Sequence, residues 1–582
     1  MYSERFWKKN WDPGIHDLKS EEYDTTYVEM IKKTFGEFPD KTAFGYLGVA
    51  VSFRELDGYA NQFANMLIEN GFEKGDIVGI NLPNIPEYVI ALIGTLRAGC
   101  VVSGVSPLLS PNQIKYQLND LGSSGNRVGL VTLDAIFAKH IVEIASDIPQ
   151  LKLVVAASVA GFLPKIKQLL ARLLKKIPTG AVGPISGKQV FHFHKDVLRS
   201  YSDGAVNVDI SPDDLGWIQY TGGTTGPPKG AMLTHKNMAH NILGVSRWLG
   251  WEYGKGRLVS AFPLFHMAGL MVCESGLYMG MSQALIPNPR DTDKLCHELD
   301  TFRPTVLANV PSLYQMLMAN ETFKTLDHSA LDVCISAAAP FPKESQKEFE
   351  AVVGEGKLLE LYGMTETSPI SMMNPSKGKK KLGTVGVPFL NTDCKLLTPG
   401  TDHEAAIGEP GEICVKGPIV MKGYFNKPEE TKNAIDENGY MHTGDVGIMD
   451  EEGYVRIVDR TKDMIIVGGF KVFSSKVEEA ISKHPAVGAM ALIGVENPER
   501  PGSEFVKAFI QIDPSYAGDA GDADNSGGGG GGNVGGADRL KEDIIAYARE
   551  NCSAYEVPKF IEIVDELPLT SVGKIDKKAL RV

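Results

Sequence analysis

Short apolar runs alternate with amphipathic segments along the first hundred residues of the chain. Residues 77–82 and 100–105 are apolar runs of strand length, and the segment near 87–98 has the length of a helix. Another segment with helical spacing follows Ser52, which forms a capping box with Glu55. Strands separated by helices of about 10–15 residues predict a parallel sheet with helices packed on its faces.

The pattern changes toward the end of the chain. Residues 383–417 combine short strands with glycine turns, which predicts a smaller β subdomain. Polar and charged residues at 459–463 indicate a linker. The predicted class is α/β, with a large N-terminal domain (1–460) of parallel-type sheets, helices and the β subdomain, and a small α+β C-terminal domain (461–582). Glycine- and aspartate-rich residues 516–537 cannot bury a core and are predicted to form a flexible loop.

Composition limits the classes of function. A chain of 582 residues with 43% hydrophobic and 23% charged residues is expected to form more than one globular domain. A formal net charge of −13 argues against nucleic acid as a partner, because phosphate binding needs a basic surface. The seven cysteines are far apart, without a CxxC pair, and no apolar leader or run of about 18 apolar residues occurs. We therefore expect a cytoplasmic protein with reduced thiols.

Residues 162–178 are both amphipathic and basic. Seven apolar residues recur there at helical spacing, with five Lys or Arg residues between them. A basic amphipathic helix can lie on the surface of an anionic membrane. The alternative is a helix that packs its apolar face on its own domain and leaves the cationic face in water.

The stretch 220–230, Tyr-Thr-Gly-Gly-Thr-Thr-Gly-Pro-Pro-Lys-Gly, has the composition of a phosphate-binding loop. It follows an apolar run and precedes a helix-like segment from about Lys236. In that context backbone N–H groups can wrap phosphate oxygens, while hydroxyls and Lys229 add donors and a cation. A Walker A loop is excluded because Gly230, rather than Ser or Thr, follows Lys229. The alternative is a solvated Gly/Thr hairpin.

This loop resembles the signature loop of the adenylate-forming enzymes: acyl-CoA synthetases, luciferases and the adenylation domains of peptide synthetases. The resemblance extends from about Tyr27 to Leu580 and is greatest to the bacterial long-chain fatty acid–CoA ligases. The other motifs of the family follow in order as Phe262-Pro-Leu-Phe-His-Met-Ala-Gly-Leu270, Leu331-Asp-Val-Cys-Ile-Ser-Ala-Ala-Ala-Pro340, Leu361-Tyr-Gly-Met-Thr-Glu-Thr-Ser368, Tyr440-Met-His-Thr-Gly-Asp-Val446, Val458 to Val472, and Leu567 to Leu580.

The resemblance implies an ATP site assembled from several of these motifs. Thr365 would contact a phosphate, and Glu366 would bind Mg²⁺, which prefers hard oxygen ligands. Ala338, Ala339 and Pro340 would cover one face of the adenine. Without the resemblance, the sequence favours an ordinary β-strand that ends in a proline turn at these residues. The residues implied in nucleotide binding are Thr221, Gly222, Gly223, Thr224, Thr225, Gly226, Lys229, Ala338, Ala339, Pro340, Tyr362 and Gly363.

The resemblance also implies roles for the acyl site and the C-terminal motif. His266 would lie beside the carboxylate of the acid, among apolar neighbours that suit a hydrocarbon chain; the alternative is a core histidine. Leu270 stands where some long-chain relatives have a bulky aromatic gate, so no gate is expected. Lys574 would stabilise the charge that develops as pyrophosphate leaves, whereas Lys577 and Lys578 are expected to face solvent.

Four further residues are assigned by the resemblance to the nucleotide, the hinge and the thiol. Asp445 would accept hydrogen bonds from the ribose hydroxyls, and Arg460 would bind ribose or phosphate. Lys462 would be the hinge about which a mobile C-terminal domain turns, and Gly469 would line the path of the pantetheine arm of CoA.

The implied function is ATP-dependent ligation of a long- or medium-chain fatty acid to CoA through acyl-AMP, with release of AMP and pyrophosphate. The alternatives are transfer to a carrier protein, an aryl or short-chain acid as substrate, and a binding module without catalysis. The third requires Lys574, Glu366 and Asp445 to be idle. The expected location is the cytoplasm, and peripheral contact of residues 162–178 with the inner membrane surface is one of the two alternatives given above for that segment. The oligomeric state has no signature in the sequence.

Overall fold

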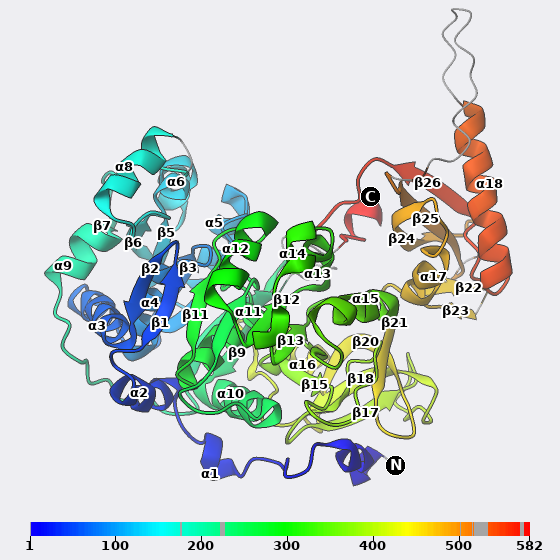
Figure 1. The fold of residues 1–582 in the computed structure, drawn as a ribbon, viewed down its shortest axis with the longest axis horizontal. Helices are drawn as coiled ribbons and strands as arrows, with labels where there is room; N and C mark the ends of the chain where they lie inside the picture. The colour runs from blue at the N-terminus through cyan, green and yellow to red at the C-terminus, as the bar shows by residue number, and fades with distance from the viewer. Residues whose placement is uncertain are drawn as a thin grey trace, which may run out of the picture. The chain divides into compact units, whose positions relative to one another are not determined.

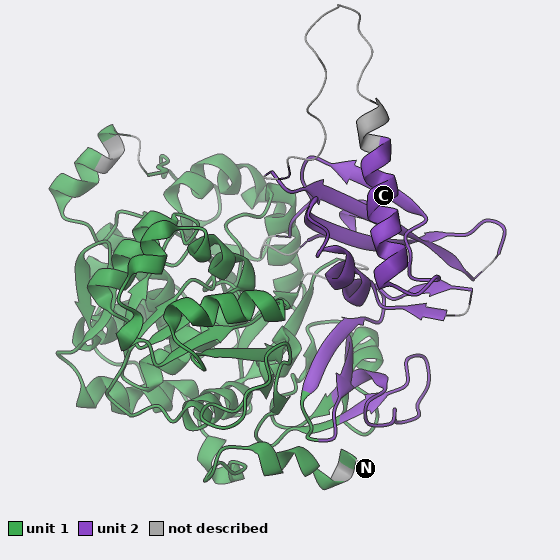
Figure 2. Ribbon diagram, turned by 45° about the vertical axis from the view of Figure 1, so that its right-hand side comes forward, with its two compact units in different colours: residues 1–394, 415–442, 452–454 green, residues 395–414, 443–451, 455–582 purple. Residues whose placement is uncertain are grey.

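The chain folds into two compact units of mixed α/β structure (Figure 1, Figure 2). Unit 1 comprises Met1–Cys394, Val415–His442 and Glu452–Tyr454, and unit 2 comprises Lys395–Cys414, Thr443–Glu451 and Val455–Val582. The computed structural model describes residues 2–174, 177–221, 227–468, 470–500, 502–514, 516, 534–570 and 575–581. The predicted fold class is confirmed, while the predicted division after residue 460 stays a prediction.

An eight-stranded sheet of unit 1 carries the predicted phosphate-binding hairpin. The strand order is β19-β9-β8-β4-β3-β5-β6-β7. Strands β3 to β7 and the β4–β8 pair are parallel, whereas β8 and β9 form an antiparallel hairpin. The strands are β3 (Ile77–Asn81), β4 (Val101–Gly104), β5 (Val128–Leu133), β6 (Leu151–Ala157), β7 (Gln189–His192), β8 (Leu215–Thr221), β9 (Lys229–Thr234) and β19 (Gly423–Tyr424).

The strands and helices predicted near the N-terminus are confirmed. The runs at 77–82 and 100–105 form β3 and β4, whose residues are all buried. Helix α3 begins after Ser52, whose hydroxyl accepts from the backbone N–H of Glu55. Helix α4 is mostly apolar, and each of its residues is buried, including Glu87 and Arg97. Helices and short turns of this part are α1 (Ser20–Tyr23), α2 (Tyr27–Glu37), α3 (Phe53–Glu69), α4 (Pro86–Arg97), α5 (Pro111–Leu121), α6 (Asp134–Ile136), α7 (Val142–Ile144), α8 (Lys165–Leu173) and α9 (Leu198–Ser200).

A second, nine-stranded sheet of unit 1 has the order β16-β15-β14-β13-β12-β10-β11-β1-β2. Its strands from β11 to β14 are parallel, so their carboxyl ends lie along one edge. The strands are β1 (Thr42–Tyr46), β2 (Val49–Ser52), β10 (Arg257–Ser260), β11 (Ser282–Leu285), β12 (Val306–Asn309), β13 (Val333–Ser336), β14 (Leu358–Gly363), β15 (Ile370–Met373) and β16 (Val387–Pro388).

The remaining helices of unit 1 connect these strands or cover the sheets. Apolar side chains of α12, α13 and α15 form one core with β12 and β13, which includes Leu295, Leu307 and Phe349. The helices are α10 (His235–Leu249), α11 (Met267–Tyr278), α12 (Thr292–Phe302), α13 (Pro311–Met318), α14 (Glu321–Thr325), α15 (Lys343–Val353) and α16 (Pro428–Ala434).

Three smaller sheets, in the orders β17-β18-β20-β21, β22-β23 and β24-β25-β26, lie wholly or mainly in unit 2. The linker predicted at 459–463 is wrong for its first two residues, because Asp459 and Arg460 belong to β21 and Asp459 is buried. Residues 534–537, predicted as loop, begin α18; residues 517–533 lie outside the described residues. The elements are β17 (Asp393–Leu397), β18 (Pro410–Lys416), β20 (Met441–Met449), β21 (Val455–Arg460), β22 (Ile465–Val467), β23 (Phe470–Val472), α17 (Ser474–Ile481), β24 (Val487–Glu496), β25 (Glu504–Ile512), α18 (Val534–Asn551) and β26 (Phe560–Val564).

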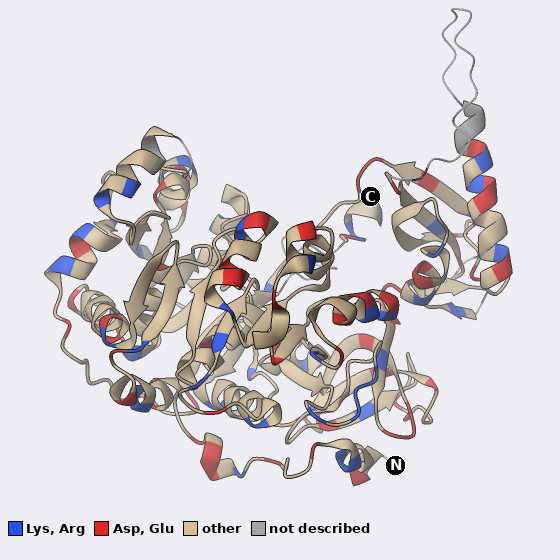
Figure 3. Cartoon of the chain, in the orientation of Figure 1, with Lys and Arg blue, Asp and Glu red and all other residues tan. Residues whose placement is uncertain are grey.

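Charged side chains are interspersed along most surface helices, and both signs occur on α15 and α18 (Figure 3). No helix of the described part combines the length and the apolar character that crossing a bilayer requires.

Candidate functional site

The two ends of the predicted phosphate-binding loop are held together by the β8–β9 hairpin. Thr221 and Lys229 are register partners, and the Thr221 hydroxyl donates to the Lys229 carbonyl at 3.5 Å. Helix α10 follows β9 directly and is capped by Thr234, as the strand–loop–helix prediction requires. Gly222, Gly223, Thr224, Thr225 and Gly226 lie outside the described residues.

Lys229 lies beside a carboxylate and an aromatic ring. Its Nζ is 2.9 Å from Glu430 Oε2 and 4.4 Å from the centre of the Tyr424 ring. Glu430 is about half exposed, and an exposed ion pair of this kind contributes little stability. The Lys229 ammonium can therefore exchange Glu430 for another anion at small cost.

Glu366 is the most buried of the predicted site residues around this hairpin. It lies in the helical turn Thr365–Thr367, and its carboxylate accepts a hydrogen bond from the Tyr424 hydroxyl at 2.7 Å. Burial raises the pKa of Glu366 above its usual value, opposed by Tyr424, Lys229 and Thr221. The structure thus brings Glu366 close to Thr221 and Lys229, which lie more than 130 residues earlier in the sequence.

Tyr424 joins this cluster, and the sequence did not indicate it. It contacts both Glu366 and Lys229 because β19 pairs with β9, which places Tyr424 opposite Ala231. β19 consists of only two residues and belongs to none of the motifs. No local pattern predicted a pairing across nearly 200 residues of chain.

Gly363 ends β14 immediately before the turn that carries Glu366. A Cβ atom at Gly363 would lie 1.6 Å from the Pro369 carbonyl oxygen, so only glycine fits this position. The preceding residue, Tyr362, is half-buried, and its carbonyl accepts from the Ser371 hydroxyl at 3.3 Å. Close packing of the segment after the turn against β14 thus fixes where Thr365 and Glu366 lie.

The three residues assigned to the adenine face follow β13 at the carboxyl edge of the second sheet. Ala338 has a left-handed backbone, with φ of 72°, and is half-buried like Ala339. Pro340 is exposed. Because β13 is adjacent to β14, this turn emerges at the same sheet edge as Tyr362. Ligands of α/β proteins bind outside the carboxyl ends of such strands.

Three buried polar side chains lie side by side near the same edge of the sheet, and the sequence did not indicate them either. Asn309 of β12 pairs in register with Ser336 of β13, which in turn pairs with Glu360 of β14. Neither the Asn309 amide nor the Ser336 hydroxyl has a hydrogen-bond partner among the residues that the structure describes. Glu360 accepts from Gln346 Nε2 at 2.5 Å, and burial raises the pKa of Glu360 to about 8.

We expect Glu360→Gln to flatten the pH dependence of stability. The folded pKa of about 8 lies above the ordinary value, so the native state holds a proton that the unfolded chain releases. This contribution to stability is complete below about pH 4 and is lost as the pH rises through about 8, by up to about 1.4 kcal/mol per pH unit. Glutamine retains an acceptor for Gln346 but does not titrate. Denaturant unfolding of both proteins across this range measures the difference.

Glu348→Gln, on the exposed side of α15, is the matched control and should follow the wild-type pH dependence. Parallel curves for the wild type and Glu360→Gln would show that Glu360 is ionised in the folded protein at neutral pH.

His266 is the N-cap of helix α11, which begins at Met267 within the motif. Its Nδ1 accepts from the backbone N–H of Ala268 at 3.3 Å, and the ring is half-buried. A Cβ on Gly104, at the carboxyl end of β4, would lie 2.4 Å from the Phe265 carbonyl oxygen. The loop that carries His266 therefore packs on β4, which is adjacent to β8. A role beside the acid's carboxylate stays a prediction. Leu270 is fully buried.

In unit 2, Asp445 and Arg460 are brought together as register partners of β20 and β21. Arg460 Nε is 3.2 Å from Asp445 Oδ1, and the Asp445 side chain is largely buried. Lys462 follows in the turn after β21. Gly469 and Lys574 lie outside the described residues, so their positions are not part of this geometry.

Lys577 does not face solvent, in contrast to the prediction. Its Nζ lies 2.7 Å from Glu478 Oε1 and donates to the Ser474 hydroxyl at 2.7 Å. The backbone N–H and hydroxyl of Ser474 in turn donate to Asp459. Burial raises the pKa of Asp459 to about 6, although the nearby Lys577 charge opposes the rise. The segment after Lys574 is thus anchored to α17, whereas Lys578 is exposed as predicted.

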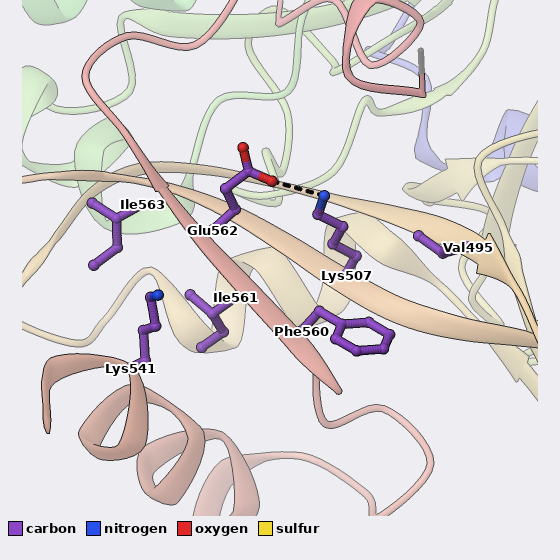
Figure 4. A pocket seen from close by; sticks show the side chains of 7 residues that line it. All are labelled: Val495, Lys507, Lys541, Phe560, Ile561, Glu562 and Ile563. Atoms are coloured by element: carbon purple, nitrogen blue, oxygen red, sulfur yellow. Dashed lines mark ion pairs between the residues drawn. The ribbon is translucent and has the colours of Figure 1, made fainter. Parts of the chain in front are cut away.

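A pocket of about 600 Å³ lies on the β24–β25–β26 sheet of unit 2, beside α18 (Figure 4). The Lys507–Glu562 ion pair of 2.7 Å and the Phe560 ring line it, together with Lys541. None of the predicted site residues contributes to this pocket, so it is not the predicted nucleotide site.

Comparison with known proteins identifies relatives along the whole chain. A family model described as "AMP-binding enzyme" matches residues 31–425, and one described as "AMP-binding enzyme C-terminal domain" matches residues 476–574. The long-chain-fatty-acid–CoA ligase of Escherichia coli O157:H7 is 35% identical over 559 residues, which cover 95% of this chain and 94% of that protein. Its counterpart from Bacillus subtilis (strain 168) is 35% identical over 587 residues, covering 100% and 98%.

The fold is also found among solved structures. The anthranilate CoA ligase AuaEII, solved in complex with anthranoyl-AMP, superposes with a TM-score of 0.81 at 24% identity. The similarity covers 97% of this chain and 98% of that chain. At this identity the likeness concerns the fold.

Proposed function

We propose, from the premise that this chain belongs to the AMP-binding enzyme family, that it is an AMP-forming ligase that joins a long-chain fatty acid to CoA. The reaction proceeds in two halves. The carboxylate of the acid attacks the α-phosphate of ATP, which gives acyl-AMP and pyrophosphate. The thiolate of CoA then attacks the acyl carbon and releases AMP. Both nucleophiles are substrates, so the protein contributes position and charge rather than a nucleophilic side chain.

The cluster of Thr221, Lys229 and Glu366 is the observation that supports the first half-reaction most strongly. Thr221 and Lys229 lie at the two ends of the loop, where the hydroxyl and the ammonium would bind phosphate oxygens. To do so, the Lys229 ammonium would break its ion pair with Glu430. The Tyr424 hydroxyl holds the Glu366 carboxylate in place. Pairing between β8 and β9 fixes the distance between the two ends of the loop.

Glu366 would hold Mg²⁺ when the nucleotide is bound. A buried carboxylate fits this ion, because Mg²⁺ takes hard oxygen ligands and needs only one or two from the protein. One Glu366 oxygen accepts a hydrogen bond from Tyr424, which fixes the orientation of the carboxylate. When bound, the ion would screen the negative charge of the phosphates.

The other residues named by the resemblance complete the proposed site. Thr365 would contact the α-phosphate, Ala338, Ala339 and Pro340 would cover the adenine, and Asp445 would accept from the ribose hydroxyls. His266 would orient the acid, and Lys574 would stabilise the leaving pyrophosphate. Between the two half-reactions, the C-terminal domain would rotate about Lys462, which would withdraw Lys574 from the active site and bring Gly469 into it. The family models on either side of residue 460 are consistent with a hinge there.

A panel of acids tests the proposed substrate class. We expect kcat/KM with free CoA to be highest for long-chain acids, lower for medium-chain acids and lowest for benzoate and anthranilate. Two acids that differ by one methylene are distinguished by only about 1–3 kcal/mol, so the change of kcat/KM over many chain lengths is the informative measurement. Preference for benzoate would establish an aryl-CoA ligase instead. Acyl transfer to a carrier protein but not to free CoA would establish the carrier alternative. The proposed location is the cytoplasm.

A further inference from the structure

Helix α8 and the residue that follows it, Leu174, expose an apolar stripe that none of the described residues covers. Ile166, Leu169, Leu170, Leu173 and Leu174 are 76%, 59%, 51%, 69% and 62% exposed. Their spacing of three and four residues places them along one side of the helix. They account for five of the twelve exposed large hydrophobic residues in the described part of the chain. The alternative in which this helix packs its apolar side on its own domain is therefore wrong.

The base of this helix is attached to unit 1 by hydrogen bonds and ring contacts among the described residues. The Tyr46 hydroxyl donates to the Val159 carbonyl at 2.7 Å, and the Phe162 ring packs on the rings of His194 and Tyr59. Gln168 closes the first turn by donating to the Leu163 carbonyl at 2.8 Å. Beyond this base, α8 lies at the edge of unit 1 (Figure 1). The base thus fixes where the helix begins and leaves the stripe open to a partner.

The charge of the same segment indicates the chemistry of that partner. Residues 162–178 contain five Lys or Arg residues and no Asp or Glu, within a chain of net charge −13. Basic side chains beside an apolar stripe match an anionic lipid surface, where the apolar residues enter the acyl region and the cations meet the headgroups. A helix of this length is also marginal in water by itself, so a covering surface would stabilise it.

We propose that α8 docks this protein peripherally on an anionic lipid bilayer, with the stripe of Ile166, Leu169, Leu170, Leu173 and Leu174 inserted among the lipids. A second copy of the chain would have to cover the apolar stripe while also neutralising five cations, and the helix itself supplies no acidic residue for that pairing. The bilayer supplies both the apolar region and the negative charge. The inference does not depend on the ligase reaction.

Vesicle binding tests the proposal. The full chain should co-sediment with vesicles rich in phosphatidylglycerol, and binding should weaken with salt and be at least about tenfold lower with phosphatidylcholine alone. Leu169→Ser/Leu173→Ser should lower binding to the anionic vesicles at least about tenfold, because membrane affinity follows buried apolar area. Lys165→Glu/Lys167→Glu should remove the preference for anionic lipid.

Leu108→Ser/Val142→Ser is the matched control, since both residues are exposed apolar residues of the same unit. It should bind vesicles like the wild type. All variants change exposed side chains and should retain the wild-type unfolding midpoint and the rate with octanoate, a water-soluble acid. Failure of the wild type to bind anionic vesicles, or equal binding by the Leu169/Leu173 variant, would overturn the proposal. So would a dimer in solution that depends on Leu169 and Leu173 without any vesicle binding.

Discussion

Glu366→Gln is expected to lower the rate of acyl-AMP formation by about 10²-fold or more, because the Mg²⁺ that Glu366 would hold stabilises the charge that develops on the phosphates. Glutamine has nearly the same shape, and its amide oxygen can still accept from the Tyr424 hydroxyl. The substitution therefore removes the negative charge without opening a cavity. Without that charge the protein offers a weaker ligand for Mg²⁺. Pyrophosphate exchange into ATP, measured against Mg²⁺ concentration, should show a lower maximum and a half-maximum at higher Mg²⁺.

Glu429→Gln is the matched control, because Glu429 lies on α16 and its side chain is 80% exposed. It should exchange pyrophosphate at the wild-type rate. Unfolding midpoints of both variants should equal that of the wild type. A wild-type Mg²⁺ dependence in Glu366→Gln would remove Glu366 from the proposed site.

Lys574→Ala is expected to slow acyl-AMP formation by about 10²–10³-fold, which corresponds to about 2.7–4 kcal/mol in the transition state. The ammonium is proposed to act on charge that develops as pyrophosphate leaves, so affinity for ATP should change little. Exchange of labelled pyrophosphate into ATP measures the chemical step, and equilibrium binding of ATP measures the ground state.

Of the two neighbouring lysines, Lys578 is a suitable control for Lys574 and Lys577 is not. Lys578→Ala should behave like the wild type, because Lys578 is exposed. Lys577 is unsuitable as a neutral control, since its ion pair with Glu478 anchors the C-terminal segment. An unchanged exchange rate in Lys574→Ala would refute the assignment of the catalytic lysine.

Local features of the fold could be predicted because they depend on residues close in sequence. The capping box at Ser52 needs only Glu55. The segments that form β3 and β4 are short apolar runs, and this apolar composition alone predicts that they are buried strands. The loop after β8 could be identified from its composition, and the family motifs placed Glu366 near it. In the structure Thr221 bonds the Lys229 carbonyl, and Lys229 and Glu366 both contact Tyr424, while their role in binding a nucleotide stays a prediction.

Features that depend on pairing between distant segments could not be predicted. Tyr424 reaches Glu366 through a two-residue strand, and the buried row of Asn309, Ser336 and Glu360 exists only because three strands are in register. Lys577 looked like a surface lysine because its partner Glu478 lies nearly 100 residues earlier. For α8, the periodicity predicted a helix, but only the structure shows that its apolar side is open.

Product analysis with a long-chain acid tests the central claim most directly. The protein is incubated with oleate, Mg²⁺, ATP and CoA, and nucleotides and thioesters are quantified together. The account predicts equal amounts of AMP, pyrophosphate and oleoyl-CoA, with no AMP when the acid is omitted. Formation of ADP and phosphate, or AMP release that does not depend on the acid, would contradict it.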